Sequence, residues 1–523
     1  MKIEAFPTLR SNEIDLKEIE NTQLDALIIG GGINGAVSAL ALSTHGLNVA
    51  VVESNDFASG VSQQSSNLVW GGFKYLESYE VRLVAELCHS RNRLARAYPT
   101  RLSETRFLAT LDDSSPFSPW FAALGSNAYW ALGQFATLRP RYRSPRTIRR
   151  LEPSVAMGKV KGGIEYSDHL LIDNDARFVA QLIVDAREKG ALAANYLSVT
   201  STERVGRYWK IKMFDEISHR EIETSARVII NTAGPEIHRT GAMLGAETRN
   251  KLVFSKGVHL IVPKITDSGR ILAFFDDQNR LFYVIPMGHR SVIGTTDTRV
   301  ETHEVEVSET DYDFLLTQAN QRLNLPSPLL RSDVISSRVG VRPLVVEENG
   351  VDLEQDWTEL SRRHAVEINT RKKVVSVLGG KLSDCLNVGE EVVKAVEKCG
   401  LKTSKPSRRW YGEPSQAEKS IFFHSAEKAG IEKEFASTIW RRHGRRAHEI
   451  VEDISNDPQR GICLSAIINY CPAELESMRS SELIETLDDF LRRRTNLKQI
   501  HSETELKNDP ALKKVSDLLF NKS

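Results

Sequence analysis

The chain has 523 residues, 41% of them hydrophobic and 26% charged, so it is long enough for two or three folded domains with a sizeable core. Basic and acidic residues number 69 each, and this zero net charge provides no overall field that favours nucleic acid. Five scattered cysteines without a C-x-x-C pair argue against a disulfide framework or a zinc or other metal site, and they suit a reducing cytoplasm.

The first residues of the chain are polar and acidic. Residues 1–20 lack the pattern of a signal peptide, and we expect residues 1–23 to form a poorly ordered arm. The apolar run from residue 24 to residue 52 is interrupted by a glycine cluster, Asn34, His45 and Asn48, which does not suit a membrane span. We therefore expect any membrane contact to be peripheral.

The segment 24–54 has the pattern of a dinucleotide-binding unit. Gly30, Gly32 and Gly35 have the G-x-G-x-x-G spacing, and Glu53 follows at the distance where an acidic side chain accepts hydrogen bonds from ribose hydroxyls. The first N–H groups of the following helix favour a phosphate. We predict strands at 26–29 and 47–52, a helix at 36–45, and binding of an adenine dinucleotide.

A segment rich in serine follows this unit, at residues 58–66. Its hydroxyls at Ser62, Ser65 and Ser66 are suited to line phosphates, although the same composition also describes a plain surface loop. The sequence alone leaves both interpretations open.

The next elements alternate between helical and aromatic segments. Apolar spacing predicts a helix at 79–97. Residues 115–138 are rich in tryptophan, tyrosine and phenylalanine, and residues 139–150 contain six arginines. Such a pair is consistent with contact to an anionic membrane surface, or with core aromatics beside a solvated basic loop.

The remaining elements indicate two sheets and a helical end. We expect a helix at 174–190, strands from 196 to 232 that return to the first sheet at NTAGP, and a second, antiparallel sheet within 252–300. The small residues of NTAGP, Gly234 among them, would allow close approach to the nucleotide. A helix at 309–323, a strand at 334–345, a strand at 374–380 running into a helix near Lys381, and a helical region at 416–498 complete the prediction.

Seven motifs occur in an order known from one family. LIIGGGINGA, SSNLVWGGFKYLE, NTAGP, SKGVHLIVP, IGTTDT, GVRPL and SVLGGKLS resemble those of FAD-dependent glycerol-3-phosphate dehydrogenases of the aerobic, respiratory type. The resemblance implies an α/β fold with a glutathione-reductase-like FAD-binding Rossmann domain, an antiparallel-sheet substrate domain and a C-terminal α-helical domain. The implied segments are 24–80, 165–235 and 365–398 for FAD, 81–164 and 236–364 for substrate, and 405–515 for the helical domain.

The same resemblance implies the reaction and the partners. Glycerol 3-phosphate, a phosphorylated polyol, would be oxidised to dihydroxyacetone phosphate, with hydride passing from C2 to N5 of FAD and electrons then passing to quinone or oxygen. It also suggests a homodimer and a cytoplasmic protein that attaches peripherally to the inner face of the cell membrane.

The matching positions supply candidate residues for this chemistry. His259 corresponds to the active-site histidine of the family and is our candidate base for the C2 hydroxyl proton. Arg342 and Arg362 correspond to phosphate-binding arginines, although Arg363 leaves the second position uncertain by one residue. Gly380 and Lys381 lie where a helix N-terminus would face the flavin, and Lys381 would contact either flavin or substrate.

Some positions depart from the pattern of the family. Asn67 replaces a basic residue, Trp70 a histidine, Lys74 an arginine and Glu236 a tryptophan, whereas Tyr75 is retained. Lys74 and Tyr75 remain candidates for substrate binding, but a lysine lacks the planar fork of arginine. Three alternatives therefore stay open: a different polyol phosphate, a hydroxy or amino acid, or a flavoprotein that has lost its activity.

Overall fold

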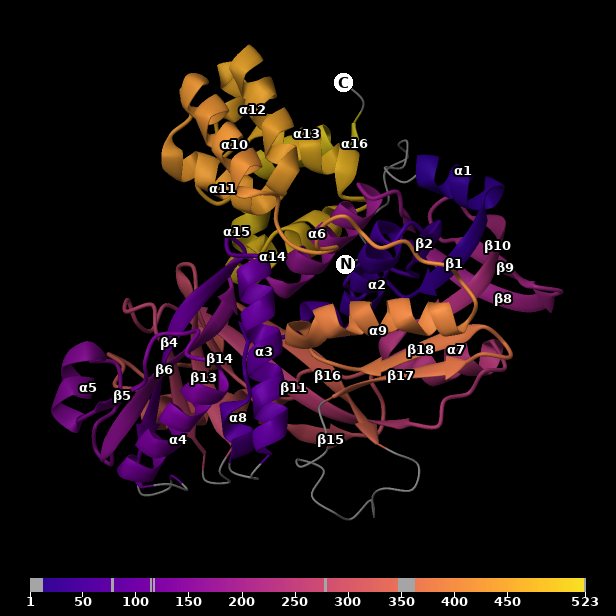
Figure 1. The fold of residues 1–523 in the computed structure, drawn as a ribbon. Helices are drawn as coiled ribbons and strands as arrows, with labels where there is room; N and C mark the ends of the chain where they lie inside the picture. Colours follow the sequence, from indigo (N-terminus) through magenta and orange to yellow (C-terminus); the bar gives the residue numbers. More distant parts are fainter. Residues whose placement is uncertain are drawn as a thin grey trace.

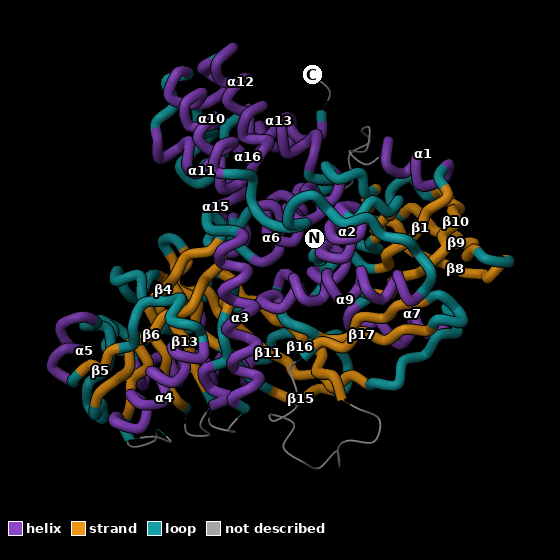
Figure 2. Tube along the Cα trace, viewed as in Figure 1, coloured by secondary structure: helices purple, strands orange, loops and turns teal. Residues whose placement is uncertain are grey.

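The computed structural model describes residues 13–76, 80–112, 115, 118–276, 280–346 and 363–521. Two β-sheets adjoin where β16 (Ser336–Val346) contacts β18 (Val374–Gly379), and a cluster of helices stands at one end of the molecule (Figure 1). Coloured by secondary structure, the strands gather in these two regions and the C-terminal part is helical (Figure 2).

The first sheet has a mostly parallel centre. β1 pairs in parallel with β10 and β2, while β9 pairs antiparallel with β10, and β17 with β18, on the side of β10 away from β1. β1 and β2 are apolar runs whose residues are nearly all buried, as expected for strands covered on both faces. The strands of this sheet are β1 (Gln23–Ile29), β2 (Val49–Val52), β7 (Leu192–Ala194), β8 (Leu197–Val205), β9 (Tyr208–Asp215), β10 (Arg220–Asn231), β17 (His364–Asn369) and β18.

Helices cover both faces of the first sheet. α2 (Ile33–Thr44) packs between α6 (Asp175–Arg187) and α9 (Cys385–Lys398) on one face. On the other face lies α1 (Glu13–Asn21), so the expectation of a poorly ordered arm is wrong for residues 13–23. The reason is that Leu16 and Ile19 are fully buried against the sheet, an apolar pair that the surrounding acidic residues hide in the sequence.

The second sheet is larger and mainly antiparallel. β11 pairs with β14, β15 and β16, and β4 joins β12 in parallel. β3 and β6 also belong to this sheet, although the predicted boundaries assign residues 68–69 and most of β6 to the FAD-binding segments. Besides β16, its strands are β3 (Leu68–Val69), β4 (Leu102–Leu111), β5 (Arg141–Arg143), β6 (Gly162–Leu171), β11 (Lys251–Pro263), β12 (Ile271–Phe275), β13 (Leu281–Met287), β14 (Arg290–Gly294) and β15 (Thr298–Val300).

Four of the remaining helices border the second sheet, and a fifth lies beside the first. α3 and α4 pack against each other, α4 and α5 against β6, α8 against β11, and α7 against β10 and β18. Their bounds are α3 (Val81–Ala97), α4 (Pro119–Leu132), α5 (Pro145–Leu151), α7 (Ile237–Met243) and α8 (Glu309–Arg322).

The C-terminal helices are joined to the first sheet by buried ion pairs. Arg494 binds Asp56 with both terminal nitrogens at 2.7 Å, and Arg177 of α6 pairs with Glu482. The helices are α10 (Gln416–Lys428), α11 (Lys433–His443), α12 (Ala447–Asn456), α13 (Pro472–Ser481), α14 (Leu497–Ile500), α15 (Glu503–Asn508) and α16 (Ala511–Phe520). In the part of the chain that the structure describes, no helix is both long and apolar enough to cross a membrane.

Candidate active site

The glycine turn between β1 and α2 is held by close backbone contacts. Gly30 has φ +106°, and a Cβ built on it would lie 2.5 Å from the carbonyl oxygen of Thr232. A Cβ on Gly35 would lie 1.9 Å from the carbonyl oxygen of Gly30. At Gly32 the only atom of the described residues near a built Cβ is the Ser62 hydroxyl oxygen, at 3.1 Å. The first and third glycines therefore allow packing, and the second leaves backbone open to a ligand.

The acidic and hydroxyl side chains around this turn are already ordered. Glu53 Oε2 accepts a 2.7 Å hydrogen bond from the Gly31 N–H, and the Ser62 hydroxyl accepts from the N–H of Ile33 at 3.0 Å. Burial raises the pKa of the Glu53 carboxyl above its usual range, although hydrogen bonds from Gly31 and Asn55 oppose this. Ser65 and Ser66 continue the same loop, and the Ser65 N–H donates to Asp175.

A second glycine turn meets the start of α2. Asn34 Nδ2 donates to the carbonyl oxygen of Gly379 at 3.0 Å, while Asn34 Oδ1 is buried and has no partner among the described residues. A Cβ on Gly380 would lie 3.7 Å from that oxygen. The open backbone at Gly32, an Asn34 oxygen without a partner among the described residues and a helix N-terminus are what an extended dinucleotide needs, so these residues fit FAD.

The predicted helix at Lys381 begins later than expected. Lys381 precedes a 3₁₀ turn at Leu382–Asp384, and α9 starts at Cys385. Lys381 Nζ donates to the Tyr75 hydroxyl at 3.2 Å and lies 4.7 Å from the centre of that ring. Trp70 packs against Tyr75 with ring centres 5.7 Å apart. The structure therefore brings Lys381 and Tyr75 together across more than 300 residues.

One face of the second sheet gathers the other candidates. β11 and β16 pair so that His259 faces Arg338 and Ser255 faces Arg342. Since side chains alternate along a strand, Arg338 and Arg342 lie on the same face as their two partners.

Arg342 lies across β11 in a cradle of oxygen atoms. A Cβ on Gly257 would be 2.4 Å from Arg342 Nη2, so only glycine leaves room for the guanidinium there. Arg342 donates to Ser255 Oγ at 3.2 Å, to Asp297 Oδ1 at 3.1 Å and to Thr295 Oγ1 at 2.9 Å. Its side chain is 29% exposed, so it is oriented yet still accessible to a ligand.

His259 is buried against the backbone of β14. A Cβ on Gly294 would be 2.8 Å from the Cδ2 of its ring, and neither ring nitrogen has a partner among the described residues. Burial, together with the charges of Arg338 and Arg342, holds the pKa of His259 well below its usual value. The imidazole is therefore neutral at physiological pH.

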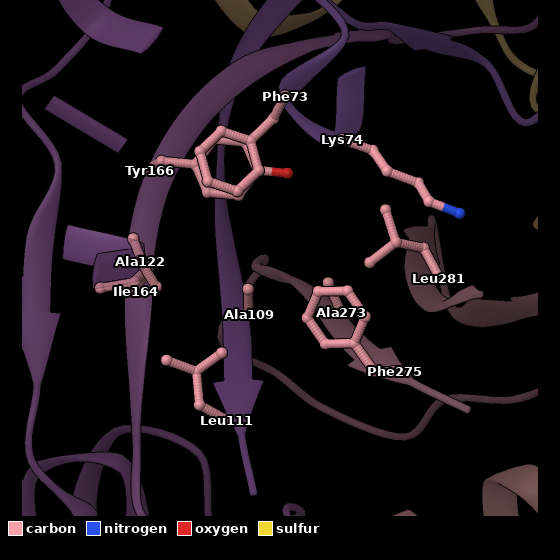
Figure 3. A pocket seen from close by; sticks show the side chains of 10 residues that line it. All are labelled: Phe73, Lys74, Ala109, Leu111, Ala122, Ile164, Tyr166, Ala273, Phe275 and Leu281. Atoms are coloured by element: carbon pink, nitrogen blue, oxygen red, sulfur yellow. The ribbon is translucent and has the colours of Figure 1, made fainter. Parts of the chain in front are cut away.

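The side chains of Lys74 and Tyr75 lie in different surroundings. Its side chain lines an apolar pocket between α4 and the strands β4, β6, β12 and β13, where the rings of Phe73 and Tyr166 stack with centres 5.0 Å apart (Figure 3). Among the described residues that line this pocket, Lys74 alone is charged, and in Figure 3 its side chain extends toward Leu281.

The remaining predicted residues are spread more widely. Gly234 has φ +59° and directly follows the segment in which Thr232 bonds back to Gly30. Arg362 lies outside the described residues, and Arg363 pairs at 2.9 Å with Glu86 of α3.

Sequence reasoning missed Asn34 and Arg338. Asn34 lies inside the glycine motif, but its bond to Gly379 spans 345 residues and leaves no local signal. Arg338 was detectable, because it lies four residues before Arg342 in a predicted strand and therefore shares its face.

These features define a dinucleotide-dependent oxidoreductase in which a cofactor-binding sheet adjoins a sheet that carries cationic and imidazole side chains. The chain belongs to the FAD dependent oxidoreductase family, whose model matches residues 25–360. A second model, described as the C-terminal domain of alpha-glycerophosphate oxidase, matches residues 408–520. The cofactor is FAD.

Individual relatives agree with this assignment. The chain is 28% identical to a glycerol-3-phosphate dehydrogenase of Synechocystis sp. over 93% of its own length and 91% of that protein. It is also 28% identical to the mitochondrial enzyme of Bos taurus, covering 93% of this chain and 69% of that one. The solved structure of the Bacillus halodurans glycerol-3-phosphate dehydrogenase with FAD has the same fold, with a TM-score of 0.73, 22% identity, and coverage of 98% of this chain and 95% of that one.

Proposed function

We propose that this protein oxidises sn-glycerol 3-phosphate to dihydroxyacetone phosphate. The observation that carries the proposal is the shared face of β11 and β16, where Arg342 and His259 lie beside the FAD-binding sheet. The glycerophosphate-oxidase type of C-terminal domain and the names of the relatives support the same substrate.

Arg342 would hold the phosphate. Its two terminal nitrogens present donors in parallel, and the hydroxyls of Ser255 and Thr295 fix their direction. Asp297 Oδ1 accepts a hydrogen bond from Arg342, so a bound phosphate would compete with that oxygen for the Arg342 donors. This competition would keep the phosphate exchangeable rather than permanently bound.

His259 would take the C2 hydroxyl proton. A neutral imidazole has a free lone pair, and its lowered pKa keeps that lone pair available across the physiological range. The same positive neighbours oppose prolonged protonation, so His259 would pass the proton on between turnovers. FAD supplies the hydride acceptor when bound.

Lys381 and Tyr75 would orient the reacting groups. The Lys381 ammonium is held by the Tyr75 hydroxyl and ring, and it lies at the turn that Asn34 binds. A cation fixed at that turn would attract negative charge that develops beside it during oxidation. From this position Lys381 would contact either the cofactor or the substrate.

A panel of substrates tests the proposal. The FAD-loaded protein is mixed without oxygen with glycerol 3-phosphate, another polyol phosphate, glycerol or glycine, and the oxidised flavin band is followed. We expect only glycerol 3-phosphate to bleach the band, because productive binding requires a substrate phosphate that Arg342 can hold. Bleaching by another polyol phosphate alone would support the first alternative substrate, and bleaching by glycine alone would contradict the proposal.

The electron acceptor is proposed to be quinone or oxygen. After anaerobic reduction, a soluble quinone or air is added and the return of the oxidised band is timed. Faster reoxidation by quinone identifies a dehydrogenase, and faster reoxidation by air identifies an oxidase. Neither acceptor restoring the band would contradict both.

A peripheral membrane contact is proposed for α4 and the segment after it. Trp120 is 70% exposed, and Phe121, Leu124, Phe135 and Leu138 are also exposed next to basic residues at 139–150. Aromatic and basic side chains together favour an anionic lipid surface. The protein should sediment with phosphatidylglycerol vesicles, and Trp120→Ser should weaken this; equal sedimentation of both would contradict the contact.

A further inference from the structure

Arg338 is a buried arginine for which the proposed reaction has no role. It is 2% exposed, and its Nη1 donates to the carbonyl oxygen of Ser65 at 2.9 Å. Its Nε and Nη2 are buried and have no hydrogen-bond partner among the described residues. A guanidinium with two open donors in the interior is costly unless a ligand completes it.

The charge around Arg338 is also incomplete. The acidic group whose charge acts on it is Asp175, and that carboxylate accepts hydrogen bonds from the N–H groups of Ser65 and Ala176. Arg492 of the C-terminal part lies near enough for its charge to interact with Arg338. Arg492 donates to Gln63 and Gln64 of the same loop. The acidic neighbour of Arg338 is therefore already occupied by two backbone hydrogen bonds, and Arg492 adds a second positive charge.

His259 lies beside Arg338 on the same face of the sheet. The two residues pair in the register of β11 and β16, His259 is 3% exposed, and both of its ring nitrogens lack a partner among the described residues. These two neighbouring side chains thus carry four polar atoms without a partner among the described residues, which points to a missing polar group.

The surroundings of Arg338 are separate from the site where Arg342 would bind phosphate. Arg338 and Arg342 are four residues apart, about 13 Å along an extended strand. Gln64 lies between them, since a Cβ on Gly340 would be 2.5 Å from Gln64 Cβ. Arg342 turns to Ser255 and Thr295, whereas Arg338 turns to the loop that begins beside the glycine motif.

We propose that Arg338 and His259 line a second, buried anion subsite at residues 61–66, which receives the negative edge of the reduced flavin ring. The inference rests on the proposed flavin-dependent oxidation. An oxygen at that edge would accept hydrogen bonds from the two open donors of Arg338.

The test uses full-length, FAD-loaded protein and two probes. Sulfite adds to flavin N5 and leaves negative charge on the ring, and its affinity is read from the flavin spectrum; inorganic phosphate is titrated in the same way. The variants are Arg338→Met, Arg338→Lys and, as a matched loss of charge, Arg331→Met. Arg331 is exposed and stacks on Tyr312, outside the site.

Arg338→Met should weaken sulfite binding at least about ten-fold and leave phosphate affinity unchanged. A loss of phosphate affinity with unchanged sulfite affinity would place Arg338 at the phosphate site of Arg342 and would overturn the separate subsite. The sulfite affinity of Arg338→Lys should lie between those of the wild type and Arg338→Met. One ammonium group cannot bind Ser65 and the ligand as the planar guanidinium does. Arg331→Met should match the wild type.

Unchanged affinity for both probes in folded Arg338→Met would overturn the subsite. If that variant loses FAD, Arg338→Lys decides by the same criterion. Neither titration needs turnover, so failure of the wild type to be bleached by glycerol 3-phosphate would count against the proposed function alone.

Discussion

Arg342 gives the account its most direct prediction at the scale of single residues. Arg342→Met should raise KM for glycerol 3-phosphate by the equivalent of about 2 kcal/mol, because a charge-assisted hydrogen bond to phosphate is lost. Arg342→Lys should recover part of the affinity, since it retains the charge without the fork. Steady-state kinetics at equal FAD content measures both. A KM unchanged in Arg342→Met would remove Arg342 from the phosphate site.

His259 predicts a pH dependence. A base must be deprotonated to act, and the pKa of His259 lies well below its ordinary value of 6.5 because of burial and two arginines. The kcat/KM profile of the wild type should therefore stay flat as pH falls through 6.5 and decline only below it. His259→Asn should lower kcat by roughly 100-fold or more. A histidine-like inflection near 6.5 in the wild type would contradict this role.

At the scale of elements, the glycine turn supports a prediction with an internal control. Gly35→Ala should destabilise the fold by about 2 kcal/mol and reduce bound FAD, because the new Cβ meets the Gly30 carbonyl oxygen. At Gly125 in α4 no atom of the described residues lies within 4 Å of a built Cβ, so Gly125→Ala should be neutral or stabilising. FAD per chain and thermal unfolding measure both. Full FAD occupancy in Gly35→Ala would show that the packing at the turn is not required.

The turn at Gly379 and Gly380 is held by His364. Its Nδ1 pairs with Asp384 at 2.5 Å and its Nε2 with Glu391 at 3.2 Å. Despite burial, these carboxylates raise the pKa of His364 to about 9. Because the folded-state pKa is raised, this stabilisation is complete below the unfolded value and is lost as pH rises through about 9.

His364→Asn should therefore cost most stability at about pH 6 and little at about pH 10. Urea unfolding of the variant and the wild type at both pH values measures the difference. A cost that does not depend on pH would mean that His364 acts through packing rather than through its charge.

At the scale of the whole molecule, the sequence predicts the helices and strands better than the long-range contacts that join them. The 24–54 unit, the returning strands ending at β10 and the helical C-terminal region are confirmed, because each follows a local period or motif. The helix at Glu13–Asn21, where a poorly ordered arm was expected, was missed because two buried apolar residues in a polar helix give a weak signal. The pairs Asp56–Arg494 and Lys381–Tyr75 link residues hundreds of positions apart, which no local pattern can predict.

The candidate site follows the same division. His259, Arg342 and Lys381 were found through motifs, and the structure adds their partners. Their roles, and those of Lys74 and Arg362, stay predictions. The strand pattern was enough to show that Arg338 shares the face of Arg342, but only strand pairing placed it beside His259.

The most direct measurement of the central claim is rapid anaerobic mixing of the FAD-loaded protein with glycerol 3-phosphate that carries either hydrogen or deuterium at C2. If the C2 hydrogen passes to the flavin, the oxidised band should bleach several-fold more slowly with deuterium. The amount of dihydroxyacetone phosphate should equal the flavin reduced. A flavin that stays oxidised with glycerol 3-phosphate of either kind would contradict the account.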